Sequence, residues 1–496
     1  MEFWNNIVNT ALLGTDKRQV SSNELPAEIA EVYEQLATNE TLDKEEKFLQ
    51  ITSVAFNYRQ CGATPFLKED LIFEKAPAET KAYCNAKALQ VLSDILQEQS
   101  YSLLEFWLQH CYKQQQIVLP EMIPTLFGIA ANKKNLSIII SQCCGERGLW
   151  LSGFNPEWNF YTLENDDDAW QNGTAEQRKK VIKKLHQADP AKAREWLQQT
   201  WSSENANAKA ELMKQLATSV TEDDVAWLES LQEEKSQKIK DVVLTLLKQI
   251  PASSIVTSYR GIVEKSITLK KEKAFLGMIN KTALHIQLPG IDENIFKTGI
   301  EKLSNTKEFT DDEFVIFQLM QFNPPENYET HFNSSPEQVI SYFQKEKATQ
   351  KFLGAIVDSI VTFKNNKWAT AFMQHSDEFY SGIISVLTED QQDRYSLNFF
   401  DKEPDNIIRL AKERESEWSV ELTKEIFKHT AKQMYQYNRA FYNECINLTP
   451  ATIVGELETC TPQEDHFKNA WSNMSEYIGK LISLKSQTIQ AFQSSN

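Results

Sequence analysis

The segment Gly-Thr-Asp-Lys-Arg, residues 14–18, places a glycine, a hydroxyl, a carboxylate and two cations side by side. Such a set could cradle a phosphate, because a glycine backbone approaches an anion closely and cations neutralise it. A Walker loop, however, needs a second glycine followed by Lys and Ser or Thr, between a strand and a helix. Here the glycine follows an apolar helical segment, so we expect it to end that helix in the left-handed conformation. The candidate partner-binding residues of this corner are Thr15, Asp16, Lys17 and Arg18.

A second candidate site is the passage from Gly145 to Trp170, which is aromatic and weakly helical. An arginine among exposed aromatic rings can form a recognition surface for another protein. The same rings can instead close the end of a helical core, with the arginine paired to an acid. The acidic run at residues 164–168 lacks the alternating ligand spacing of a calcium loop, so we expect it to be solvated. The candidate partner-binding residues are Arg147, Trp150, Asn155 and Trp158, with Tyr161 as a further aromatic neighbour.

Three cations, Arg178, Lys209 and Lys240, recur at a constant spacing along the chain. Such a column could bind the phosphates of a nucleic acid. In stacked helical repeats, similar columns more often pair with acids of the next repeat. Both interpretations remain open from the sequence.

Other catalytic or metal-binding signals are weak. The seven histidines contain no H-E-x-x-H motif, and the chain has no G-x-S-x-G elbow. The seven cysteines are scattered without a Cys-x-x-Cys spacing, and adjacent Cys143 and Cys144 cannot easily reach one metal. We therefore expect no cofactor, no metal and no catalytic residue, and a reduced, cytoplasmic compartment.

The amino-acid composition limits the classes of partner that the chain is expected to bind. The 52 basic and 69 acidic residues give a net charge of −17, which opposes binding to nucleic acid or an anionic membrane. Only 15 residues are glycine, which argues against glycine-rich phosphate loops. The first ten residues lack the pattern of a signal peptide. The longest apolar stretch, near Phe352 to Phe363, contains Asp358 and is too short to cross a bilayer.

An internal repeat indicates the fold that must position these residues. The segments TAEQRKKVIKKL, NANAKAELMKQL and SQKIKDVVLTLL begin at Thr174, Asn205 and Ser236, so successive segments are equally spaced. All three first residues are good N-caps, and apolar columns recur at matching positions within the segments. Two helices in each unit of this length predict an all-α, HEAT-like superhelix, since single hairpins must stack to bury their apolar faces.

Four regions follow from these patterns. Residues 1–163 form an N-terminal helical region, and residues 164–262 contain the HEAT-like repeats. Residues 263–305 form a joint with at most a small β insertion near 266–289, where apolar residues alternate and end at a proline. Residues 306–496 form a C-terminal helical region.

The first and last predicted helices each carry an apolar stripe. The final helix has apolar residues at steps of four and three from Phe467 to Leu481, until Lys485 interrupts the seam. A seam this short indicates packing within the chain rather than a dimer zipper. The first helix has one apolar face made by Trp4, Ile7, Val8, Ala11 and Leu12.

With these motifs in place, the chain resembles a bacterial family of unknown function. Its members begin with a tryptophan helix ending in A-L-x-G-T-D-[RK]-R. They continue with G-x-R-G-x-W-L…N-P-x-W and then D-P-x-x-A-R-x-x-L…W closing on L-P-x-S. The corresponding segments here are 11–18, 145–158, 189–201 and 250–253, so the resemblance covers roughly the first half of the chain.

In that family, the genes commonly lie beside those for a MoxR-type AAA ATPase, a von Willebrand A-domain protein and a SWIM zinc-finger protein. The resemblance thus implies a scaffold or adaptor in a chaperone-like system, and it supplies no catalytic residue. We predict a non-enzymatic, cytoplasmic protein-binding scaffold with a MoxR-type AAA ATPase or von Willebrand A-domain protein as its partner. The alternative is a helical-repeat nucleic-acid-binding protein, or a DNA-repair enzyme, that uses the basic column. Oligomeric state stays open.

Overall fold

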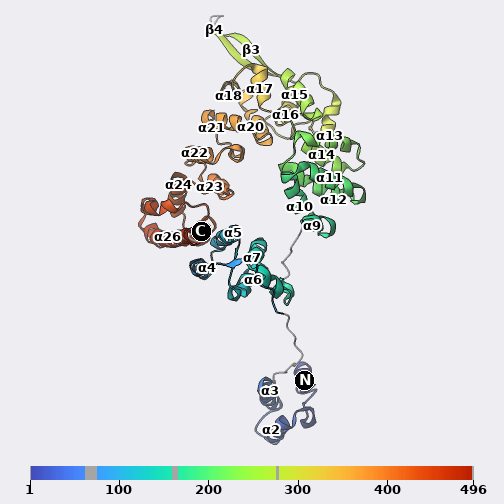
Figure 1. Ribbon diagram of the computed structural model, residues 1–496, viewed down its shortest axis with the longest axis vertical. Helices are drawn as coiled ribbons and strands as arrows, with labels where there is room; N and C mark the ends of the chain where they lie inside the picture. Colours follow the sequence, from blue (N-terminus) through green and yellow to red (C-terminus); the bar gives the residue numbers. More distant parts are fainter. Residues whose placement is uncertain (1, 62–74, 159–165, 275–278, 494–496) are drawn as a thin grey trace. The chain divides into compact units, whose positions relative to one another are not determined.

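A computed structural model describes residues 2–61, 75–158, 166–274 and 279–493, with the side chains of residues 271–282 left out. The chain divides into two compact units, which we call unit 1 (Met1–Lys75) and unit 2 (Ala76–Asn496) (Figure 1). The predicted all-α fold is confirmed, since the described residues are mainly helical and form only two small two-stranded sheets. No helix in the described ranges is both long and apolar enough to cross a membrane.

Unit 1 is built from three α-helices around a small core. The start of α1 packs against the end of α3, where the rings of Phe3 and Tyr58 lie 6.0 Å apart. The two helices therefore run antiparallel. The helices are α1 (Glu2–Leu13), α2 (Ala27–Ala37) and α3 (Lys44–Cys61). The core residues are Ile7, Val20, Leu25, Ile29, Ile51 and Ala55.

Helix α1 ends at the glycine, as the sequence predicts. Gly14 has φ 87°, and its N–H donates to the carbonyl oxygen of Thr10 at 2.9 Å. This left-handed conformation is open to glycine without the steric cost of a Cβ. The turn that follows brings the predicted corner, residues 15–18, back toward α3.

Unit 2 begins with a helical layer that contains a short parallel sheet. Strand β1 (Ala82–Tyr83) pairs with β2 (Gln116–Ile117), one on each side of the first helical hairpin. The helices of this layer are α4 (Ala86–Glu98), α5 (Tyr101–Lys113), α6 (Ile123–Asn132), α7 (Ser137–Cys143) and α8 (Gly145–Ser152).

The repeat region follows the predicted constant spacing. Thr174, Asn205 and Ser236 are the N-caps of α10, α12 and α14. Lys238 donates at 3.1 Å to Asn207, which lies 31 residues earlier, at the equivalent position of the preceding repeat. The helices of this region are α9 (Asp166–Asn172), α10 (Ala175–Ala188), α11 (Pro190–Thr200), α12 (Ala206–Lys214), α13 (Val225–Ser230), α14 (Gln237–Leu247) and α15 (Ser254–Ser266).

The predicted β insertion is an antiparallel hairpin. Strand β3 (Ile267–Ala274) pairs with β4 (Ile279–Ile286), so that Leu269 lies opposite Leu284. Ile267 and Leu284 are buried at the base of the hairpin. The alternating apolar residues thus face the helical core, as expected for a half-buried strand pair.

The C-terminal half of unit 2 returns to its first helices. Helix α26 packs against α4 and α5, and the Asn85 side-chain amide donates to the Ala491 carbonyl oxygen at 2.8 Å (Figure 1). The predicted apolar seam from Phe467 to Leu481 is therefore largely used within the chain. The helices are α16 (Asp311–Met320), α17 (Glu326–Phe332), α18 (Pro336–Gln344), α19 (Lys347–Gln350), α20 (Leu353–Thr362), α21 (Asn366–His375), α22 (Glu389–Phe399), α23 (Pro404–Lys412), α24 (Val420–Ala431), α25 (Arg439–Glu444) and α26 (Asp465–Gln493).

Candidate functional site

Two cations of the predicted basic column form internal ion pairs. The Arg178 guanidinium lies 2.5 Å from the Glu204 carboxylate and 4.4 Å above the ring of Trp170. Lys209 lies 4.7 Å above the ring of Trp201, whose indole N–H donates to Glu234.

The same acid, Glu234, stands 3.8 Å from Lys209. The two tryptophans under the cations, Trp170 and Trp201, have the same spacing in the sequence as the cations. This shared spacing is the sequence signal that these cations pack on rings within the chain. No ion pair of Lys240 is found among the described residues, and its side chain is half-buried on α14.

The aromatic passage is mostly used for packing within unit 2. Trp158 lies 5.3 Å from the buried ring of Phe127, and the Asn155 side chain accepts from the N–H of Glu157 at 3.0 Å. Trp150 packs edge-on against Phe154, whose side chain is 56% exposed. Trp158 therefore packs against the core of unit 2, whereas the ring of Phe154 is exposed and Trp150 is half-buried beside it. Residues 159–165, which include Tyr161 and the start of the acidic run, lie outside the described residues; Asp166, within that run, pairs with Lys184 at 2.7 Å.

Arg147 belongs to a helix start that the sequence did not reveal. The Glu79 carboxylate accepts the N–H groups of Glu146 and Arg147, each at 2.9 Å, and so caps α8. Gly145 before them has φ 62° and leaves room for this carboxylate. Glu79 was missed because it lies 67 residues before Glu146, and no local pattern announces it.

Three cysteines that are scattered in sequence meet in the core of unit 2. The Sγ atoms of Cys84 and Cys111 lie 3.5 Å apart, and Cys143 packs beside them on α7. Hydrogen bonds with Cys143 and Cys84, together with burial, raise the pKa of the Cys111 thiol. Burial also raises the pKa of Cys144 well above the usual value. The thiols of Cys111 and Cys144 are therefore protonated and weakly nucleophilic at neutral pH.

No group of three or more His, Cys, Asp or Glu residues within the described ranges is arranged to hold a metal ion.

A serine, a histidine and an aspartate come together between α10 and α13. The Ser219 hydroxyl lies 2.6 Å from His186 Nδ1, and His186 Nε2 lies 3.4 Å from Asp224. These are the residue types of a hydrolytic triad. However, His186 and Asp224 are fully buried, and Asp224 also accepts from Arg194 at 2.5 Å and from the Thr221 N–H at 2.8 Å.

The space beside this network does not reach the serine. A groove of about 210 Å³ is lined by the flanking Thr218 and Val220, whereas the Ser219 hydroxyl faces the histidine. We therefore interpret the network as a polar tie between consecutive repeats.

This network predicts an acid-sensitive contribution to stability. Burial alone would raise the pKa of Asp224, but hydrogen bonds from His186, Thr221 and Arg194 outweigh it and hold the pKa below its usual value. Because the folded pKa is lowered, the stabilisation is complete above the unfolded pKa and is lost as pH falls through the folded value.

Asp224→Asn should lower the free energy of unfolding by about 1–3 kcal/mol at pH 7. The difference from wild type should shrink as pH falls below about 5. Urea unfolding at several pH values measures both effects, and a difference independent of pH would show that the carboxylate charge contributes nothing.

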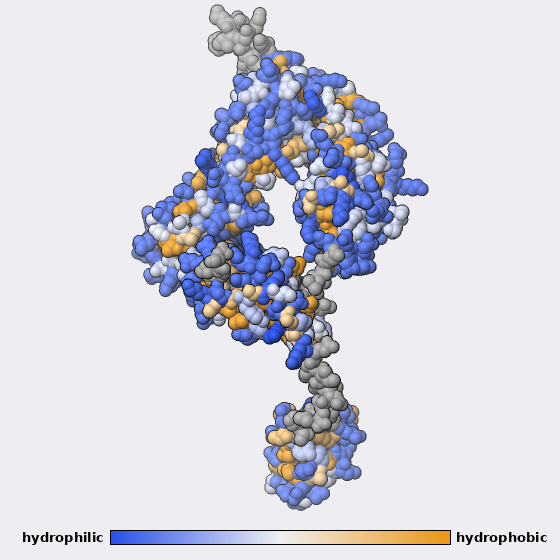
Figure 2. Space-filling view, in the orientation of Figure 1, coloured by the Kyte–Doolittle hydropathy of each residue, from blue (hydrophilic) through white to orange (hydrophobic). Residues whose placement is uncertain are grey.

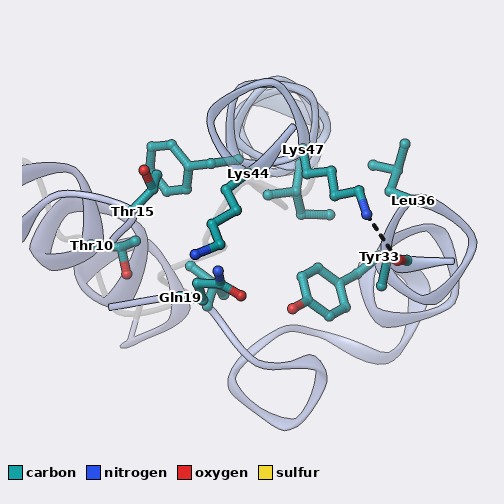
Figure 3. Close-up of a pocket in the computed structure, with 11 residues that line it drawn as sticks. Thr10, Thr15, Gln19, Tyr33, Leu36, Lys44 and Lys47 are labelled. Atoms are coloured by element: carbon teal, nitrogen blue, oxygen red, sulfur yellow. Dashed lines mark hydrogen bonds between the residues drawn. The ribbon is translucent and has the colours of Figure 1, made fainter. Parts of the chain in front are cut away.

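The predicted corner of unit 1 lies at the rim of a pocket between its three helices (Figure 3). Thr15 lines this pocket, and Asp16 stands 3.8 Å from Lys44 at its edge. Arg18 turns away and binds Glu24 at 3.0 Å, while Lys17 is exposed. Of the four predicted residues, only Thr15 lines the pocket, and Asp16 lies outside it beside Lys44.

The pocket has an apolar floor and a polar rim. Its volume is about 260 Å³. Lys44 reaches into it beside Gln19, and the hydroxyl of Tyr33 faces the same space (Figure 3). Lys47 donates to the Ala37 carbonyl oxygen at 3.0 Å. The floor residues are Val20, Leu36, Phe48 and Ile51.

The apolar face predicted for α1 is only half covered. Ile7 lies in the core with 2% exposure, but Val8 is 39% and Leu12 is 79% exposed. On the antiparallel α3, Leu49 and Phe56 are 63% and 46% exposed. We call these four exposed side chains the α1–α3 surface, and Figure 2 shows hydrophobic residues on the visible face of unit 1.

Residues 6–492 match the model of a family described as a family of unknown function (DUF5691). The match extends the predicted resemblance from the first half to nearly the whole chain. No curated protein matches the chain significantly, and the same holds for solved structures. On the strength of the family match, the chain belongs to this family of unknown function, DUF5691.

Proposed function

We propose that the chain is a non-enzymatic scaffold that binds another protein through unit 1. The observation that carries this proposal is the α1–α3 surface, where Leu12 is 79% and Leu49 is 63% exposed. Contiguous apolar side chains on a folded surface, rimmed by polar residues, are typical of protein-binding sites. Trp4 extends the surface, because its ring lies 6.0 Å from that of Phe56.

The antiparallel pairing supports treating these side chains as one patch. Trp4 meets Phe56 at one end of the helix pair, and Thr10 shares the pocket with Phe48 at the other end. Val8 and Leu12 follow Trp4 at steps of one helical turn along α1, so they lie on one stripe of that helix. Leu49 and Phe56, two turns apart, lie on one stripe of α3.

The partner class comes from the family resemblance. We propose a MoxR-type AAA ATPase or a von Willebrand A-domain protein, with both proteins in the cytoplasm. Nucleic acid is not proposed as a partner, because Arg178 and Lys209 are already paired with Glu204 and Glu234. The net charge of −17 also opposes a polyanion.

The double variant Leu12→Glu/Leu49→Glu should bind its partner at least about tenfold more weakly than wild type, because carboxylates would be desolvated in an apolar interface. The affinity is measured by biolayer interferometry with a purified MoxR-type AAA ATPase and, separately, a von Willebrand A-domain protein from the same cells. Both leucines are exposed, so the melting temperature should change little.

Leu303→Glu provides the matched control, since Leu303 is 68% exposed in unit 2. It should leave the affinity unchanged. Equal binding of the double variant and wild type, with both folded, would remove the α1–α3 surface from the interface.

A further inference from the structure

The pocket of unit 1 differs in charge from the rest of its unit. Residues 2–61 contain ten acidic and only five basic side chains. None of the described residues that line the pocket is acidic, whereas Lys44 and Lys47 both line it. The side chains at the rim of the pocket therefore carry positive charge, whereas unit 1 as a whole has a negative net charge.

Lys44 makes a single, solvent-exposed ion pair among the described residues. It is the first residue of α3, and the positive end of a helix dipole disfavours a cation there. Its neighbour Asp16 stands 3.8 Å away, but the two side chains are 86% and 62% exposed, for Asp16 and Lys44 respectively. Such a solvated pair contributes little. An arriving carboxylate would thus meet an ammonium group that has no strong competing partner.

The size of the pocket selects against a large ligand. Its volume of about 260 Å³ lies at or below the lower end of the roughly 300–1,000 Å³ typical of small-molecule sites. The floor formed by Val20, Phe48 and Ile51 is apolar, and Val20 and Ile51 are almost fully buried. The space suits one bulky apolar side chain with a carboxylate held at the rim.

We propose that this pocket receives a peptide segment of the partner protein, with an apolar side chain on the floor and a neighbouring carboxylate bound by Lys44 and Lys47. This inference rests on the proposed scaffold function and adds the chemistry of the segment recognised. Helices α1 and α3 contribute both to the α1–α3 surface and, together with α2, to the pocket, so one partner can occupy both. Gln19 and the Tyr33 hydroxyl, which also face the pocket, can bond the peptide backbone (Figure 3).

The test selects a phage-displayed library of random peptides on the full-length protein. Enriched peptides should share a Leu, Ile, Met or Phe next to an Asp or Glu. A fluorescein-labelled copy of the best peptide, measured by anisotropy, should bind the variant Lys44→Glu/Lys47→Glu at least about tenfold more weakly. Selection on that variant should instead enrich peptides with Lys or Arg beside the apolar residue.

Lys134→Glu/Lys307→Glu is the control, because it changes the net charge equally at two exposed lysines of unit 2. It should leave peptide binding unchanged. Should the double pocket variant fail to fold by circular dichroism, Lys44→Glu alone serves, since this side chain is 62% exposed. Peptides that bind wild type and pocket variants equally would overturn the proposal, and so would a selection without an acidic–apolar pattern.

A competition experiment distinguishes a peptide ligand from a free carboxylic acid with an apolar chain. Millimolar isocaproate should displace the labelled peptide only weakly; complete displacement would assign the pocket to a small carboxylic acid and overturn the peptide proposal. The variant Leu12→Glu/Leu49→Glu keeps the pocket and should bind the peptide normally. If the wild-type protein binds the enriched peptide but neither the AAA ATPase nor the von Willebrand A-domain protein, the proposed partners are wrong and this inference stands. Binding of either partner by wild type without any enriched peptide counts against this inference alone.

Discussion

Replacing Lys485 with methionine should lower the free energy of unfolding by about 2–4 kcal/mol, because buried carbonyl groups lose their hydrogen-bond donor. Its side chain is 2% exposed on α26, and its ammonium group lies 2.7 Å from the Glu417 carboxylate. It also donates to the carbonyl oxygens of Ile446, Asn447 and Thr449, at 3.2, 2.9 and 2.8 Å. Methionine keeps much of the volume but leaves these buried acceptors without a donor. Urea unfolding followed by circular dichroism measures the change.

Lys480 on the same helix is the control. Its side chain is 58% exposed and pairs with Glu98, so Lys480→Met should change the free energy of unfolding by less than about 1 kcal/mol. A similar small effect at Lys485 would mean that water replaces the lysine at the three carbonyl groups.

The variant Gly145→Ala should lower the free energy of unfolding by about 2–3 kcal/mol, from left-handed strain and a lost helix cap. Gly145 has φ 62°, and a Cβ there would clash with the Glu79 carboxylate. Glu79 must then move, and the N–H groups of Glu146 and Arg147 lose their acceptor. Thermal and urea unfolding both measure this loss.

Gly128 offers a control of opposite sign. It lies in the exposed part of α6, and nothing within 4 Å would meet its added Cβ. Gly128→Ala should therefore raise stability by about 0.5–1 kcal/mol through helix propensity. If Gly145→Ala raised the free energy of unfolding as Gly128→Ala is expected to do, the cap by Glu79 would contribute nothing to stability.

The repeat fold was predictable because its signals are local. Thr174, Asn205 and Ser236 cap helices wherever the chain can form them, and the step between them sets the stacking period. The hairpin was predictable for the same reason, since alternation and a closing proline lie within one short segment. The seam up to Leu481 was likewise visible as a spacing pattern.

Contacts between distant segments were not predictable in the same way. In the sequence, Lys485 interrupts the apolar seam. In the structure its buried ammonium group donates to the carbonyl oxygen of Ile446, 39 residues earlier, and to carbonyl groups close to it. The meeting of Cys84, Cys111 and Cys143 depends on the packing of α5 and α7, which no cysteine spacing encodes. Glu79 likewise acts on a helix that begins far later in the chain.

The residues of the unit 1 pocket were predictable from the sequence only in part. The corner at residues 14–18 was predicted from its composition, and of its residues Thr15 lines the pocket while Asp16 lies 3.8 Å from Lys44. Lys44 and Lys47 were missed, because they become neighbours of the corner only when α3 folds back along α1. The exposure of Val8 and Leu12 was also not predicted. Periodicity identifies an apolar stripe on a helix, but it does not show whether another element covers that stripe.

The contact between Asn85 and Ala491 spans 406 residues, so α4 and α5 stay without their α26 partner for most of the time that a ribosome takes to make the chain. At synthesis rates of about 5–20 residues per second, that interval is roughly 20–80 s. The apolar side chains of α4 and α5 that α26 covers, such as Trp107 against Phe492, lack this cover during that time. Protein yield in cells should therefore depend on chaperones that shield newly made segments more strongly than the stability of the finished fold would suggest.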